Sequence, residues 1–338
     1  MGNLRAMMVL VACLLAISVL AAGTAPLVLL QTIPLPDLRD GDFDHLVADA
    51  IDGLLFVAAE ENSKIEIFDL HTNRLIHTIS DAKAPHAMVY RTDLRKLFVV
   101  DDATGVKIYE GDSYKAIGSI KLQDAADSMA YDPSTKYMYV VNGGKEAYMP
   151  YSFISVIDTT SAQKLADIKI DSDSVEAMAI EKSGPRLFAN LTGKAAVGVI
   201  DREKRTVIAN WPLAQEGKTN TAMALDEAGH RLFIATRKPP KLVVLDSDSG
   251  KVVASLPCAD MADDLTYDSM QKRIYLSGSE FIDVFQQRDA DHYALIGKVP
   301  GGFRAKTAVL APELNRYYLA VPRYWGKTAG LRVYQVLP

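Results

Sequence analysis

The sequence predicts an all-β protein, a seven-bladed β-propeller built from four-stranded blades. Three observations lead to this fold class. Seven segments share one pattern of short apolar strands and polar turns, successive segments start 41, 41, 49, 45, 42 and 43 residues apart, and β-branched and aromatic residues dominate their strands. A period of about 40–45 residues that is made of strands is typical of propeller blades.

Each repeat opens with a polar residue, which is followed by a first apolar strand, a turn and an aromatic-rich second strand. Alternating apolar residues bounded by turn residues are the signature of strands in a sheet. The seven openings are HLVADAIDGLLFVAA from His45, HAMVYRTDLRKLFVV from His86, DSMAYDPSTKYMYVV from Asp127, EAMAIEKSGPRLFAN from Glu176, TAMALDEAGHRLFIA from Thr221, DDLTYDSMQKRIYLS from Asp263 and KTAVLAPELNRYYLA from Lys306.

The third strands of the repeats read IEIFDL, VKIYEG, ISVIDT, VGVIDR, LVVLDS, IDVFQQ and LRVYQV, and polar turns then lead to fourth strands such as LIHTIS. The last repeat ends at LRVYQVLP and has no fourth strand of its own. The segment LVLLQTIPLP near the N-terminus is a spare strand. We therefore expect it to complete the last blade and to close the ring, which leaves only short protected edges.

The N-terminal segment predicts export. It carries one positive charge, then an apolar run from Met7 to Ala22, then small residues, which is the pattern of a secretory signal peptide. We expect a signal peptide over residues 1–23, one propeller domain over residues 24–338, and a periplasmic or extracellular location. The alternative is an uncleaved membrane anchor. Cleavage removes Cys13, so that Cys258 has no partner for an internal disulfide.

Composition limits the possible partners. The net charge is −5 and the chain has no long basic run, which argues against nucleic acid, because phosphate binding needs clustered Lys and Arg. No segment after the signal peptide is apolar enough to form a membrane span. We expect a monomer whose partner is a small polar ligand or another protein.

One motif suggests a family. Residues 139–142 read YVVN, and the first two repeats carry the looser versions FVAA and FVVD. This motif resembles that of the YVTN-repeat seven-bladed propellers, which are commonly exported bacterial proteins, and the resemblance extends over nearly the whole chain after the signal peptide. It implies a binding protein of unknown ligand. The family has no single catalytic motif whose residues could be transferred to this chain.

The polar residues that open the first strands are the candidate functional residues. First strands line the channel of a propeller, and antiparallel alternation brings their starting points to one end of it. We therefore expect one ligand-binding ring at the channel mouth, in which two of the six histidines of the chain occupy neighbouring positions. The ring consists of His45, His86, Asp127, Glu176, Thr221, Asp263 and Lys306.

The ring permits several functions, and the sequence leaves them open. His45 and His86, together with Asp127, could hold one divalent transition metal, since imidazole and carboxylate ligands suit zinc, copper, iron or manganese. The same groups could bind a polar ligand without a metal. An enzyme, either a lactonase-like hydrolase or a lyase, could use Glu176 or Asp263 as a ligand or base. A structural envelope scaffold with a polar, water-filled channel would show the same residue types.

Loops at the same end of the propeller could add to the ring. Tyr148 lies in the long loop NGGKEAYMPYS and Trp325 lies in VPRYWGKTAG, and exposed aromatic residues on loops often mark recognition surfaces. They could equally fold back onto the blades. The loops after the second strands are acidic in the first two repeats and basic in the fifth and seventh, which predicts a dipolar face.

Overall fold

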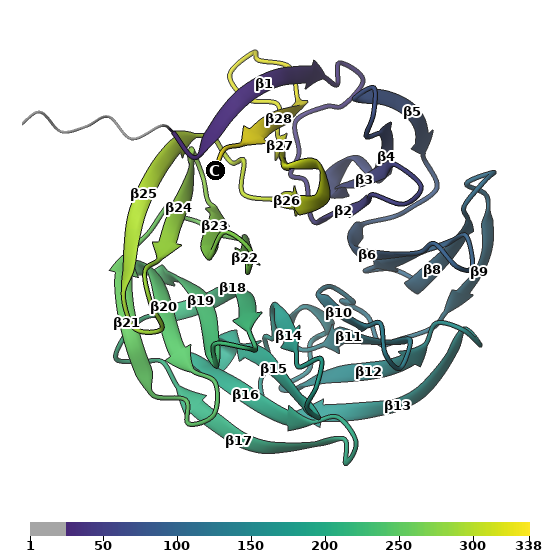
Figure 1. Ribbon diagram of the computed structural model, residues 1–338. Coiled ribbons are helices and arrows are strands. Elements are labelled where there is room, and N and C mark those ends of the chain that lie inside the picture. The colour runs from purple at the N-terminus through teal and green to yellow at the C-terminus, as the bar shows by residue number, and fades with distance from the viewer. Residues whose placement is uncertain (1–24) are drawn as a thin grey trace, which may run out of the picture.

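The computed structural model describes residues 25–338, so the predicted signal peptide lies outside the described residues. These residues form seven antiparallel sheets of four strands each. The sheets are arranged around a central channel, with one strand of each sheet next to the channel and one at the rim (Figure 1). The predicted all-β, seven-bladed propeller is therefore confirmed.

The first four blades follow the repeats in order. Blade one contains β2 (Leu46–Asp49), β3 (Leu54–Ala59), β4 (Lys64–Asp69) and β5 (Arg74–Ile79). Blade two contains β6 (Pro85–Arg91), β7 (Lys96–Asp101), β8 (Gly105–Glu110) and β9 (Ala116–Ile120). Blade three contains β10 (Met129–Asp132), β11 (Tyr137–Gly143), β12 (Ser152–Asp158) and β13 (Gln163–Ile170). Blade four contains β14 (Met178–Ile180), β15 (Arg186–Leu191), β16 (Ala196–Asp201) and β17 (Thr206–Pro212).

The remaining blades continue in the same way. Blade five contains β18 (Lys218–Asp226), β19 (Arg231–Lys238), β20 (Pro240–Asp246) and β21 (Val252–Pro257). Blade six contains β22 (Asp264–Asp268), β23 (Arg273–Ser277), β24 (Phe281–Gln287) and β25 (Tyr293–Pro300). Blade seven contains β26 (Ala308–Ala311), β27 (Arg316–Val321), β28 (Gly330–Val336) and β1 (Leu27–Pro34). Short 3-10 helices occupy four connections: η1 (Glu60–Asn62), η2 (Lys145–Ala147), η3 (Thr192–Lys194) and η4 (Pro312–Leu314).

The ring is closed by the two ends of the propeller. Strand β1 pairs antiparallel with β28, in a register that runs from Leu27 opposite Val336 to Pro34 opposite Gly330. Leu27 and Ile33 of β1 are buried in blade seven. The sequence-based expectation that the N-terminal strand completes the last blade is consistent with this pairing.

The core lies between neighbouring blades. The second and third strands of each blade are almost wholly buried, whereas the fourth strands consist mostly of exposed and half-buried residues. The aromatic residues that mark the second strands are packed in this core, among them Phe56, Phe98, Phe188 and Phe233, which are fully buried. Burial of these rings supplies much of the hydrophobic stabilisation, and it explains why the repeat is richest in aromatic residues at this position.

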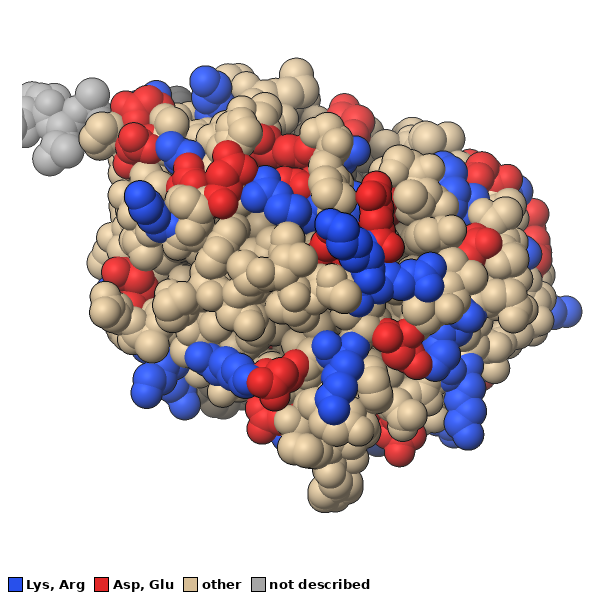
Figure 2. Space-filling model, turned by 90° about the horizontal axis from the view of Figure 1, so that it is seen from below, with Lys and Arg blue, Asp and Glu red and all other residues tan. Residues whose placement is uncertain are grey.

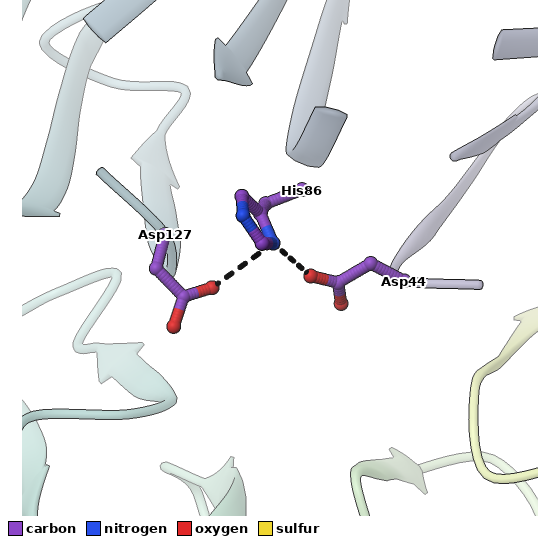
Figure 3. Close-up of side chains that lie close together, drawn as sticks. All are labelled: Asp44, His86 and Asp127. Carbon is purple, nitrogen blue, oxygen red and sulfur yellow. Dashed lines mark hydrogen bonds and ion pairs between the residues drawn. The ribbon is translucent and has the colours of Figure 1, made fainter. Parts of the chain in front are cut away.

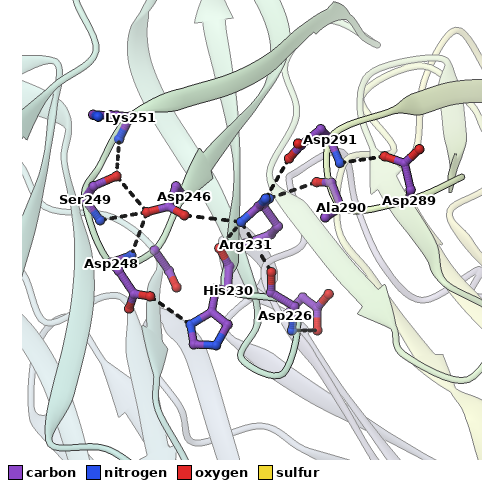
Figure 4. A network of polar contacts seen from close by, with 12 residues as sticks. Asp226, His230, Arg231, Asp246, Asp248, Ser249, Lys251, Asp289, Ala290 and Asp291 are labelled. Carbon is purple, nitrogen blue, oxygen red and sulfur yellow. Dashed lines mark hydrogen bonds and ion pairs between the residues drawn. The ribbon is translucent and has the colours of Figure 1, made fainter.

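The Asp residues that end the third strands shape the turns. The Asp69 carboxylate accepts a hydrogen bond from the Thr72 amide at 2.7 Å, and the Asp246 carboxylate accepts one from the Ser249 amide at 2.8 Å (Figure 4). Such local bonds favour tight turns. In the same region Arg231 of blade five donates to Asp291 of blade six at 2.6 Å, so turns also connect adjacent blades.

The charges on the side of the molecule shown in Figure 2 are mixed. Lys and Arg side chains alternate there with Asp and Glu side chains, and neither sign forms one large patch. Within residues 25–338, no helix is long and apolar enough to cross a membrane.

Candidate functional site

The ring residues and the loops after the second strands lie at the same end of the channel, which we call the channel mouth. Glu60 and Asp102, from the loops that follow β3 and β7, line one cavity together with the ring residues His86, Asp127 and Glu176. The antiparallel order of the strands therefore places these groups as the sequence predicts.

The centre of the mouth is a cluster of Asp44, His86 and Asp127, contributed by three consecutive blades (Figure 3). The His86 Nδ1 atom lies 2.5 Å from Asp44 Oδ2 and 3.5 Å from Asp127 Oδ1. The side chains of Asp44 and His86 are 13% and 14% exposed, whereas that of Asp127 is 38% exposed. Asp127 is thus the member of the cluster that solvent or a ligand reaches most easily.

His45 lies beside this cluster but points to a different carboxylate. Its Nδ1 atom lies 2.9 Å from Asp264 Oδ1, and its Nε2 atom lies 3.5 Å from Asp44 Oδ1. Asp264 also accepts a hydrogen bond from the Ala308 amide at 2.7 Å. The ligand atoms that come within 4.8 Å of one another belong to Asp44, His86 and Asp127, and His45 is outside this set.

The other half of the mouth is neutralised by ion pairs. Asp263 contacts both Arg237, at 2.5 Å, and Lys306, at 3.0 Å. Arg304 forms an ion pair with Asp42. Three cations of this half of the mouth are therefore matched with carboxylates, and of these Arg237 belongs to the predicted basic loops.

Two further polar side chains near the mouth donate hydrogen bonds to the backbone of other segments. Thr221 is buried, and its hydroxyl donates a hydrogen bond to the Ala262 carbonyl at 2.7 Å, which joins blades five and six. Arg323, one of the basic loop residues, donates to the carbonyls of Leu38 and Pro36. The Thr221 hydroxyl is therefore not available to a ligand at the mouth, and the Arg323 guanidinium is held against the segment before β2.

A cavity of about 310 Å³ opens beside the Asp44–His86–Asp127 cluster and is lined by residues of blades one to four. We call it the mouth cavity. The glycines of the blade-three loop allow its wall to pack closely, since a Cβ atom on Gly144 would lie 2.5 Å from the Asp173 carbonyl oxygen. Its charged lining consists of Glu60, His86, Asp102, Asp127, Lys145, Glu146, Asp173 and Glu176. Six of these eight groups are acidic.

The two charged groups at the centre of the cluster stabilise each other. Burial would raise the pKa of Asp44, but the positive charges of His45 and His86 hold it well below its usual range. Burial would lower the pKa of His86, but its hydrogen bond with Asp44 and the charges of Asp44 and Asp127 raise it to about 9. Asp44 and His86 therefore form an ion pair at neutral pH.

Three other carboxyl groups of the cavity are compensated less completely by nearby cations. Burial, followed by the negative charges of Asp127 and Asp263, raises the pKa of Glu176 to about 8. Burial and the charge of Asp44 raise the pKa of Asp127 to about 6, and burial raises the pKa of Glu60 to about 7. The cavity thus contains more carboxyl groups than the cations of the protein neutralise, and such a site favours a positively charged ligand.

The aromatic loops reach solvent. Tyr148 is 98% exposed at the tip of the blade-three loop, and Trp325 is 79% exposed. Trp325 stacks on Phe303 with 4.8 Å between ring centroids, and Tyr324 meets its edge at 5.6 Å. The blade-seven loop therefore combines local packing with an exposed aromatic surface, whereas Tyr148 has no such support.

Sequence reasoning missed Asp44 and Asp264. Each is adjacent to a ring residue, one position before His45 and one position after Asp263. Successive side chains of a strand point to opposite faces, so the neighbours of a ring position can turn toward the opening when the strand start is irregular. The repeated acidic residue beside the ring position, in DH from Asp44 and DD from Asp263, was the available signal.

The fold and the mouth cavity define the class of protein: it is a seven-bladed propeller with an acidic cavity at one end of its channel. No family model matches the chain, and no curated protein matches it. The YVTN resemblance therefore stays a prediction.

Solved structures share the fold. A chain of hydrazine synthase from Kuenenia stuttgartiensis is 18% identical, with a TM-score of 0.75 over 87% of this chain and 96% of that chain. The RRP9 WD40 repeats are 12% identical, with a TM-score of 0.74 over 93% and 99% of the two chains. A chain of the mitotic checkpoint complex is 12% identical, with a TM-score of 0.77 over 99% and 100%. At these identities the similarity establishes the propeller fold alone.

Proposed function

We propose that this chain is an exported, YVTN-type propeller that binds a small cation in the mouth cavity. One observation carries the proposal: the cavity gathers six carboxylic side chains around His86 and Lys145, whereas the cations across the mouth are paired with Asp263 and Asp42. A cation would relieve the repulsion among these carboxylates, and an anion would increase it. We place the protein in the periplasm or outside the cell, where such ligands would be captured.

Isothermal titration calorimetry tests the proposal. The full-length chain would be titrated separately with ZnCl₂, MnCl₂, the organic dication putrescine and the anion citrate. We expect at least one cation to bind, Glu60→Gln to weaken its binding by about tenfold or more, and citrate not to bind. Glu313→Gln, an exposed substitution in η4, is the matched control and should leave binding unchanged. Failure of all three cations to bind, or binding of citrate, would contradict the proposal.

An enzyme is the second candidate, and Glu176 favours it. This side chain lines the same cavity as His86 and Asp127, and among residues 25–338 no group donates a hydrogen bond to its carboxylate. It is therefore free to act as an acid or base on a ligand in the cavity, whereas Asp263 is held by two cations. Turnover of lactones, esters or lyase substrates that is lost in Glu176→Gln at saturating cation would favour a hydrolase or lyase.

A protein partner at the same face is favoured by the exposed aromatic loops. Propeller folds commonly bind proteins, and exposed Trp and Tyr residues are frequent in the centres of interfaces. In this case we expect a Tyr148→Ser/Trp325→Ser variant to lose the partner and to retain cation binding. A purely structural scaffold predicts that neither the loops nor the cavity residues affect any small-ligand binding.

A further inference from the structure

The Asp44–His86–Asp127 cluster has the donor set of a transition-metal site. One imidazole nitrogen and two carboxylate oxygens come within 4.8 Å of one another, and three neighbouring blades contribute one ligand each. Magnesium and calcium favour sites made of oxygen ligands alone. A mixed set of nitrogen and oxygen suits zinc, manganese, iron or copper, and two carboxylates balance the charge of a divalent ion.

The arrangement leaves room for further ligands on the ion. Three protein groups fill fewer than the four to six positions that these metals use, and the cluster borders the mouth cavity of about 310 Å³. Asp127 is the most exposed of the three and lies on the cavity side. Water or a small ligand could therefore complete the coordination sphere from the cavity.

The contacts of His45 are those of a residue that orients a metal-binding side chain. Its Nε2 atom is 3.5 Å from Asp44 Oδ1, its Nδ1 atom is 2.9 Å from Asp264 Oδ1, and Asp264 is itself bonded to the Ala308 amide at 2.7 Å. Both ring nitrogens thus face carboxylates, and His45 lies outside the set of ligand atoms that come within 4.8 Å of one another. Hydrogen-bonded series of side chains of this kind orient the protein groups that bind a metal, and they typically change metal affinity by about 10–100-fold.

We propose that the bound cation is a divalent transition metal held by Asp44, His86 and Asp127, and that His45 is a positioning residue that orients Asp44 through the contact with Asp264. This inference rests on the proposed function and names its ligand. It differs from the sequence-based hypothesis, in which His45 and His86 are both ligands.

Metal analysis tests the ligand set. The full-length chain would be stripped with a chelator, dialysed against ZnCl₂ or MnCl₂, and analysed by mass spectrometry of the metals and by calorimetry. We expect about one equivalent per chain, little or none in Asp127→Asn, and a 10–100-fold weaker affinity in His45→Gln. Asp263→Asn is the matched control, because it removes an equivalent carboxylate of the ring, and it should retain the metal.

Electron paramagnetic resonance of the Cu²⁺-loaded protein separates a ligand from a positioning residue. The nitrogen hyperfine pattern should report one coordinated imidazole in the wild type and in His45→Gln, and none in His86→Ala, whose folding circular dichroism would verify. A second nitrogen that disappears in His45→Gln would make His45 a ligand and overturn that part of the inference.

The outcomes also distinguish the inference from the proposed function. If putrescine binds in a Glu60-dependent manner and no metal is taken up, the metal inference fails and cation binding stands. If neither a metal nor putrescine binds, both fail. If metal uptake is equal in the wild type and in Asp127→Asn, the ion lies elsewhere and the assigned cluster is wrong.

Discussion

Equivalent residues of the repeat have acquired opposite environments at the mouth. Asp127 and Asp263 both open a first strand, yet Asp263 is paired with Arg237 and Lys306, whereas the nearest cation to Asp127 is His86 at 3.5 Å. A partly desolvated carboxylate that lacks a close cation is costly to the folded protein. Such a cost is retained where a ligand supplies the missing charge, and for this reason we assign the binding role to the Asp127 side.

The free-energy cost of an uncompensated carboxyl group in the cavity can be measured at Glu176. Burial, followed by the charges of Asp127 and Asp263, raises its pKa to about 8, above the value of about 4.3 for an unfolded chain. The folded state therefore binds more protons than the unfolded state between these two pH values, and stability falls as pH rises through that window. We expect Glu176→Gln to be more stable than the wild type without added metal, by a margin that grows from pH 5 to pH 8 and then levels off.

Urea unfolding at several pH values would measure this margin. Glu313→Gln, in exposed η4, controls for the loss of a surface charge and should show no pH-dependent gain. A Glu176→Gln margin that is constant or shrinks over this range would show that the carboxyl group is not held in its neutral form by the cavity.

At the scale of the elements, strand β1 holds the ring closed. Leu27 is 2% exposed and packs in the core between blades six and seven, whereas Leu29 on the same strand is 47% exposed. Loss of a buried leucine side chain typically costs about 2–5 kcal/mol, and a surface substitution costs within about 0.5 kcal/mol. We expect Leu27→Ala to lower the free energy of unfolding in urea by the larger amount and Leu29→Ala by the smaller. Equal effects would mean that β1 does not close the ring in solution.

The elements also show how far the sequence determines the fold. The repeat spacing and the spare N-terminal strand were sufficient to predict seven blades and their closure, because each blade repeats one apolar pattern. The starts of the first strands were less regular than the repeat: β14 begins at Met178, two residues after Glu176, whereas β18 begins at Lys218, three residues before Thr221. Strand ends depend on pairing with the next strand and on loop length, which the repeat alone does not specify.

The irregular strand starts also explain what the sequence could not predict about the site. At the start of a first strand, either of two adjacent side chains can face the channel. Asp44, which precedes β2, and Asp264, the first residue of β22, therefore lie at the mouth beside the predicted positions. The neutralisation of Asp263 depends on Arg237, which comes from the preceding blade 26 residues earlier. Contacts between blades of this kind arise from the closed ring, and a strand-by-strand reading of the sequence does not contain them.

At the scale of the whole molecule, the proposed metal site is a link between blades. Asp44, His86 and Asp127 belong to blades one, two and three, so an ion bound to all three opposes separation of those blades. The unfolded chain does not hold these residues together. Binding to the folded state alone stabilises it by about 2.7 kcal/mol when the free ligand is at 100 times its dissociation constant.

We therefore expect ZnCl₂ or MnCl₂ to raise the thermal midpoint of the stripped protein by several degrees, in proportion to the logarithm of the free metal concentration, and a chelator to reverse the shift. Differential scanning calorimetry of the wild type beside Asp127→Asn and Asp263→Asn would measure this effect. Since Asp263 lies on the neutralised side of the mouth, its variant should respond like the wild type, whereas Asp127→Asn should not respond. A shift of equal size in all three proteins would place the stabilising ion outside the cluster, and no shift in any of them would mean that no bound ion links these three blades at the mouth.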